Sequence, residues 1–109
     1  MEFTVHARHG KVPDSLRNQA VRRFGRLEKI DNRITSGTIV FDGAPSGRRV
    51  EARLYLAGGP PIVGHGEGNT MRGAMEGALH RLERQLKRRR RRMIDRRSRP
   101  VGLRETATT

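Results

Sequence analysis

The chain has 109 residues, which is enough for one domain with a hydrophobic core of modest size. Its 24 lysines and arginines outnumber its 11 aspartates and glutamates, and the resulting net charge of +13 is typical of proteins that bind a polyanion. Cysteine is absent, no apolar run approaches the roughly 18 residues that a membrane span needs, and the first residues lack the apolar segment of a signal peptide. We therefore expect a soluble, cytoplasmic protein that binds nucleic acid, without disulfides and without a membrane partner.

The N-terminal part of the chain predicts a strand followed by an amphipathic helix. Residues 2–8 alternate between apolar and polar side chains, which is the pattern of a half-buried strand. A helix is expected over residues 16–30, with Pro13 in its first turn and Gly25 weakening it by roughly 1 kcal/mol relative to alanine. Its predicted apolar face, at steps of 4, 4 and 3, consists of Leu16, Ala20, Phe24 and Leu27.

Three further strands are predicted in the middle of the chain, over residues 35–42, 49–56 and 62–67. Segments rich in glycine and proline separate them and are typical of turns. In the third of these strands, Gly64 and Gly66 occupy the side expected to face inward. Glycine weakens a strand, but it also allows a helix to approach the sheet closely.

A long amphipathic helix is predicted over residues 70–97, with Thr70 as its N-cap. Its apolar face at helical spacing consists of Met71, Met75, Ala78, Leu79, Leu82 and Leu86. Residues 98–109 contain proline and glycine and have no periodicity, so we expect a disordered tail after a single domain over residues 1–97.

The elements follow the order β-α-β-β-β-α, and each of them has one apolar face. A four-stranded sheet with two helices packed on one face buries all of these surfaces, so the sequence predicts an α+β fold whose other sheet face is exposed to solvent. The long helix would measure about 42 Å, whereas a seven-residue strand covers only about 23 Å. The arginine-rich end of the helix should therefore extend beyond the sheet. The predicted common core contains Phe24, Leu27, Val50, Ala52, Leu54, Leu82 and Leu86.

Basic residues recur at helical spacing on both predicted helices. We call Arg81, Arg84, Arg88 and Arg91 the long-helix ridge, and Arg22, Arg26 and Lys29 the short-helix ridge. Two parallel basic ridges suit the two phosphate tracks of a folded nucleic acid, and the preference for arginine favours RNA. A merely solubilising face is the plainer interpretation, but five consecutive arginines from Arg88 to Arg92 repel one another unless a polyanion supplies counter-charge. Only Tyr55 among the aromatic residues is predicted outside, which disfavours base stacking on single strands.

Catalytic motifs are absent from the sequence. The four histidines are not spaced as metal ligands, and no nucleophile elbow, phosphate-binding loop or dinucleotide fingerprint occurs. The glycine-rich segment over residues 64–68 is a weak signal for a phosphate cradle because it lies at a strand end. We therefore expect no enzyme, no metal, no cofactor and no small-molecule substrate.

Three segments carry a resemblance to a known family: VPDSLRNQAVRRFGRLEK, RRVEARLYLAGG and MRGAMEGALHRLERQLKRRRRR. With them, residues 2–95 resemble the ribosome hibernation promoting factor family, also called ribosome-associated inhibitor or sigma-54 modulation proteins. The resemblance implies a fold similar to a double-stranded-RNA-binding domain. It also implies binding in the small-subunit channel for messenger and transfer RNA, with inhibition of translation in stressed bacteria. Long members carry a second domain, so this chain resembles a short member, expected to be a monomer off the ribosome.

The resemblance implies RNA-binding roles for Arg23, Arg26, Arg81, Arg84, Arg88 and Arg90. Together with the helical pattern, the full set of candidate RNA-binding residues is Arg22, Arg23, Arg26, Arg81, Arg84, Lys87, Arg88, Arg90 and Arg91. One departure is Arg72, where the family has an aromatic residue. Two alternatives stay open at this point: a general binder of structured RNA without preference for ribosomes, and a regulator that binds another protein.

Overall fold

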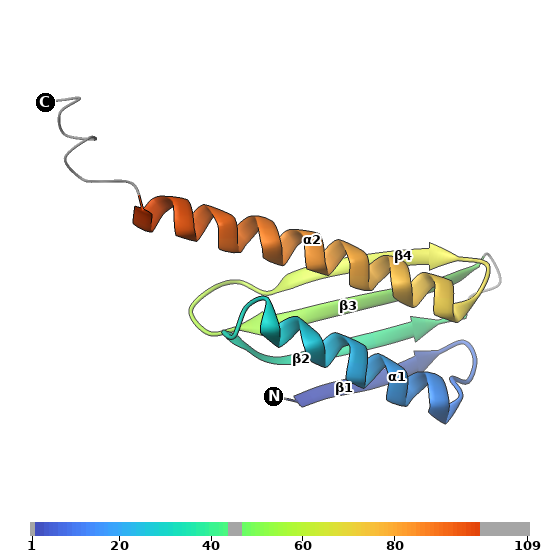
Figure 1. The fold of residues 1–109 in the computed structure, drawn as a ribbon. Coiled ribbons are helices and arrows are strands. Elements are labelled where there is room, and N and C mark those ends of the chain that lie inside the picture. Colours follow the sequence, from blue (N-terminus) through green and yellow to red (C-terminus); the bar gives the residue numbers. More distant parts are fainter. Residues whose placement is uncertain (1, 44–46, 99–109) are drawn as a thin grey trace, which may run out of the picture.

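The computed structural model describes residues 2–43 and 47–98, with side chains as far as Arg92 (Figure 1). The elements in chain order are β1 (Glu2–Arg8), α1 (Asp14–Gly25), the short 3-10 helix η1 (Arg26–Lys29), β2 (Ile34–Asp42), β3 (Arg48–Leu56), β4 (Ile62–Gly68) and α2 (Met71–Ser98). Residues 99–109 of the predicted tail lie outside the described residues. No helix in the described ranges is both long and apolar enough to cross a membrane.

The four strands form one sheet in the order β1-β2-β3-β4. Strands β1 and β2 are parallel because α1 crosses over the sheet between them, whereas the other neighbouring pairs are antiparallel. Both helices cover the same face of the sheet, and α2 extends well beyond the strand ends (Figure 1). The predicted α+β fold, with two helices on one face, is confirmed.

The core lies between this sheet face and the two helices. All seven residues predicted for it are buried, with exposed fractions of at most 1%. Phe41 and Ile39 of β2 and Met75 of α2 are also fully buried, so sheet and helices share one continuous cluster. Along β2 and β3, mostly polar side chains alternate with the buried ones and form the open face of the sheet.

Glycines allow α2 to lie directly on β4. A Cβ atom on Gly64 would lie 2.8 Å from Cγ of Leu82, and one on Gly66 would overlap the backbone of Ala74. A Cβ atom on Gly77 of α2 would lie 3.3 Å from the Cα atom of Gly66, so helix and strand backbones meet at glycines. The predicted close approach is confirmed, and it explains the glycine-rich segment by packing and not by phosphate binding.

The starts of the two helices differ in how well the sequence predicts them. Thr70 caps α2 as predicted, because its Oγ1 accepts a hydrogen bond from the N–H of Gly73 at 3.0 Å.

The prediction for the first helix is wrong at both ends. Pro13 precedes α1 and does not lie in its first turn, and its carbonyl accepts the N–H of Arg17 at 3.0 Å. The α-helix ends at Gly25, and the tighter η1 then turns Leu27 into the core.

Side chains from the helices satisfy one backbone carbonyl on each outer strand. Arg17 of α1 donates to the carbonyl of Val5 in β1 at 2.9 Å, and Gln85 of α2 donates to the carbonyl of Val63 in β4 at 2.9 Å. Such contacts leave fewer free backbone groups for pairing with another chain. They also tie each helix to the outer strand beneath it.

Candidate nucleic-acid interface

The long-helix ridge lies on the solvent side of α2. Helical period places its four arginines away from Leu82 and Leu86, which are fully buried, and all four are exposed. Arg81, Arg84, Gln85 and Arg88 line a shallow hollow of about 200 Å³. Lys87 and Arg90 are exposed on neighbouring positions of the same helix. The predicted outward orientation of the four ridge arginines and of Lys87 is confirmed.

The short-helix ridge is exposed too, but it changes course at Gly25. Arg22 belongs to α1, whereas Arg26 and Lys29 belong to η1. In a 3-10 helix, side chains three residues apart eclipse one another, so Arg26 and Lys29 lie one above the other. All three side chains are exposed to solvent. The sequence therefore predicted the residues of this ridge but not its bend.

Helices α1 and α2 run side by side in the same direction (Figure 1). Polar contacts bridge the seam between them. The guanidinium of Arg23 donates from Nη1 and Nη2 to the two carboxylate oxygens of Glu76, at 2.6 and 2.9 Å. One turn earlier, Nη1 of Arg72 donates to Oε1 of Gln19 at 2.6 Å. These hydrogen bonds raise the pKa of Arg23 and lower the pKa of Glu76, to which the charge of Arg72 also contributes.

A third contact closes the seam where η1 ends. Nη1 of Arg90 donates to the carbonyl of Ile30 at 3.1 Å. Beside it, the buried carboxylate of Asp31 accepts hydrogen bonds from the guanidinium of Arg33 at 2.9 and 3.1 Å. Hydrogen bonds from Arg33 lower the pKa of Asp31, and the nearby charge of Arg89 lowers it further. The side chain of Arg89 is half-buried near Asp31, so Arg89 does not belong to the exposed ridge.

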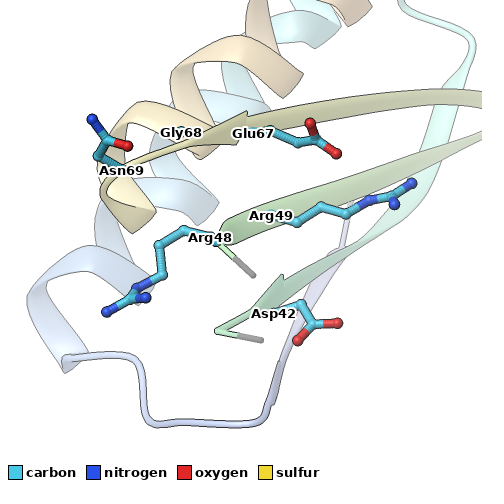
Figure 2. Close-up of a pocket in the computed structure, with 7 residues that line it drawn as sticks. Asp42, Arg48, Arg49, Glu67, Gly68 and Asn69 are labelled. Atoms are coloured by element: carbon cyan, nitrogen blue, oxygen red, sulfur yellow. The ribbon is translucent and has the colours of Figure 1, made fainter. Parts of the chain in front are cut away.

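The open sheet face has mixed charge. In register across the four strands lie Arg8, Asp42, Arg49 and Glu67. Figure 2 shows Arg49 between Asp42 and Glu67 at one end of the sheet, beside a hollow of about 500 Å³. Opposite charges alternate along this row, so the hollow does not attract anions as the helix side does.

Several other ionisable groups on or beside the sheet occur as pairs. Nδ1 of His9 lies 2.9 Å from Oδ1 of Asp42. Glu51 lies 3.5 Å from Arg53 and 3.6 Å from His65. Within residues 2–43 and 47–98, no three histidine, aspartate or glutamate side chains gather as a metal site. These groups are placed to stabilise neighbouring strands.

Sequence reasoning placed all nine candidate residues on the helices but missed the seam. Seven of the nine point freely into solvent, whereas Arg23 and Arg90 are engaged between the helices. The sequence pattern did not identify Glu76 and Gln19 as residues of the seam between α1 and α2. The available signal was the four-residue spacing of Gln19 and Arg23 on one helix and of Arg72 and Glu76 on the other.

Comparison with known proteins places this geometry in a family. The family model described as sigma 54 modulation protein / S30EA ribosomal protein matches residues 3–94. A ribosome hibernation promoting factor from Pseudomonas putida is 28% identical over 87 residues, covering 80% of this chain and 84% of the relative. The protein of the same name from Azotobacter vinelandii is 27% identical over 96 residues, covering 88% and 89%.

Solved structures have the same fold. A ribosomal subunit interface protein from Coxiella burnetii superposes with a TM-score of 0.75 at 21% identity, covering 83% of this chain and 98% of that one. The N-terminal domain of Protein Y from Thermus thermophilus gives a TM-score of 0.72 at 25% identity, covering 81% and 98%. Because the family model matches residues 3–94, most of the sequence, this chain belongs to the sigma 54 modulation protein / S30EA ribosomal protein family.

Proposed function

We propose that this protein is a ribosome hibernation factor that binds RNA of the small ribosomal subunit through its two basic ridges and performs no chemistry. The observation that carries the proposal is the placement of both ridges on the helix side of the molecule, exposed and free of buried contacts. The names of the relatives, which describe ribosome hibernation and a ribosomal subunit interface, support the ribosome as the partner.

The distribution of charge favours one orientation toward RNA. On the open sheet face, three arginines stand against four acids, so its net charge is close to zero: Arg8, Arg49 and Arg53 against Glu2, Asp42, Glu51 and Glu67. The net charge of +13 is therefore carried by other parts of the molecule, among which the helices contribute both ridges. Each lysine or arginine that meets a phosphate releases counterions, so RNA should meet the helices and leave the sheet exposed.

Recognition of this kind depends on phosphate positions and RNA shape. Tyr55, the most exposed aromatic residue of the described part at 39%, lies on the sheet and away from both ridges. The ridges themselves consist of arginine and lysine, which can bind two phosphate tracks of a folded RNA without reading its bases. A channel that holds messenger and transfer RNA is lined by such folded RNA. A protein that occupies this channel would exclude messenger and transfer RNA and so block translation. It would do so in the cytoplasm, as a monomer, through the domain of residues 1–97.

A general binder of structured RNA is the second candidate, and the scarcity of base-reading groups on the ridges favours it. The two functions separate in a competition experiment. Labelled protein bound to purified small subunits is challenged with duplex RNA whose nucleotide concentration equals that of the subunit RNA. A preference of about ten-fold or more for subunits supports the hibernation function. Equal competition by duplex RNA would refute it in favour of the general function.

A further inference from the structure

We propose that Arg23 and Glu76 form a brace between α1 and α2, so that Arg23 positions the two ridges for RNA binding and is not itself a phosphate contact. The inference rests on the proposed function and concerns how its binding surface is held together. It assigns a role to Glu76, an acid in the middle of a basic surface. It also separates Arg23 from its neighbours Arg22 and Arg26.

The geometry of the brace restrains both helices. Both terminal nitrogens of the Arg23 guanidinium are used, and both oxygens of the Glu76 carboxylate accept. Such a two-point contact fixes orientation as well as distance. The side chains are 30% and 46% exposed, so the pair lies at the surface, where an ion pair adds little to overall stability. Its main effect is then on the relative position of α1 and α2.

A second contact one turn away makes the restraint directional. Gln19 and Arg23 are four residues apart on α1, and their partners Arg72 and Glu76 are four residues apart on α2. Because the helices run in the same direction (Figure 1), the two contacts follow one another along the seam. Sliding of one helix along the other by one turn would break both. The contact of Arg90 with the carbonyl of Ile30 restrains the other end of the seam.

The same geometry argues against a phosphate at Arg23. A phosphate within hydrogen-bond distance of this guanidinium would also lie close to the carboxylate of Glu76, which is negatively charged. By contrast, Arg22 and Arg26 form no ion pair within the described part of the chain. Their charges remain available to phosphates, whereas the charge of Arg23 is already neutralised.

A charge swap tests the brace without changing the net charge. Binding to purified small subunits is measured for Arg23→Glu, for the swap Arg23→Glu with Glu76→Arg, and for a control that combines Arg22→Glu with Glu76→Arg. The swap and the control both keep the net charge at +13, because one positive and one negative residue are exchanged. We expect the swap to restore the affinity that Arg23→Glu loses, and the control to remain weak because its charges are not paired.

The salt dependence of binding gives a second readout. Loss of a phosphate contact should reduce the slope of log affinity against log salt by about 0.7–0.9. We expect this reduction for Arg22→Gln and an unchanged slope for Arg23→Gln, whose affinity should fall by at most about five-fold, the upper end for an exposed ion pair. Arg23→Lys should behave like Arg23→Gln. Lysine keeps the positive charge, but it cannot make the two-point contact with the carboxylate of Glu76.

The outcomes distinguish the brace from the function on which it rests. A folded swap variant that binds no better than Arg23→Glu, or a reduced slope for Arg23→Gln, would show that Arg23 contacts RNA directly. Failure of the unmodified protein to bind small subunits would refute the proposed function instead. In that case a double-mutant cycle on the free energy of unfolding, with Arg23→Gln and Glu76→Gln, still tests the brace. Zero coupling between the two residues would overturn it.

Discussion

Replacing Gly66 by alanine tests the contact that positions α2 on the sheet. The new Cβ atom would overlap the carbonyl of Ala74 and lie against the backbone N–H of Ala78, and neither backbone can rotate away as a side chain could. Gly66 does not have a positive φ, so the effect comes from this contact and not from backbone strain. Overpacking of a well-packed core typically costs about 1–3 kcal/mol. Because backbone atoms oppose the methyl group, we expect at least about 2 kcal/mol for Gly66→Ala.

Gly25→Ala is the matched control, since it adds the same methyl group. Gly25 has helical dihedral angles, φ −62° and ψ −27°, and nothing lies within 4 Å of the position its Cβ atom would occupy. Alanine should therefore stabilise the protein by roughly 0.4–1 kcal/mol. Urea unfolding followed by circular dichroism at the helix band measures both changes. If Gly66→Ala is neutral, or if both variants shift stability in the same direction, α2 does not rest on β4 through glycine.

Two further predictions concern the core and the buried acid. Leu82 is fully buried on α2, so Leu82→Ala should lower the free energy of unfolding of the protein by about 2–5 kcal/mol. A loss below about 0.5 kcal/mol would show that the apolar face of α2 is misplaced. The folded-state pKa of Asp31 is lowered by Arg33, so its stabilising contribution is present above the unfolded value of about 3.9 and is lost as pH falls through the folded value. Asp31→Asn should therefore show a smaller loss of stability between pH 5 and pH 2 than the unmodified protein, in unfolding measured across that range, and an identical pH profile would contradict this assignment.

Hydrophobic periodicity was sufficient to predict the fold because each element has one unambiguous apolar face. Leu82 and Leu86 on α2 and Val50 on β3 became buried as the pattern required. The sequence did not predict the two ends of the first helix correctly, because more than one backbone conformation is locally possible at each end. Gly25 permits either an α or a 3-10 continuation, and burial of Leu27 in the folded core selects the tighter one.

The candidate interface was predictable in composition but not in detail. Helical spacing alone predicted that Arg84 and Arg88 lie on the outside of α2. It could not separate Arg22 from Arg23, because the distinction arises from Glu76, which is 53 positions away from Arg23 in the sequence. Contacts of this range depend on how the two helices lie on the sheet, and no periodic pattern encodes that.

The central claim is that the long-helix ridge, and not the net charge, binds the small subunit. A variant with all four ridge residues changed to glutamine is compared with a variant in which Arg8, Arg48, Arg49 and Arg53 of the sheet are changed to glutamine. Each variant loses four positive charges, so both have a net charge of +9, from +13 minus 4. All eight side chains lie outside the core, so circular dichroism should show both variants folded.

Sedimentation with purified small subunits, repeated at several salt concentrations, is the most direct measurement. We predict that the ridge variant no longer sediments with subunits at physiological salt and that its slope of log affinity against log salt falls by about 3–4, which corresponds to four lost phosphate contacts. The sheet variant should keep nearly the affinity and slope of the unmodified protein. Equal loss of binding by the two folded variants would contradict the claim, because net charge alone would then explain the association.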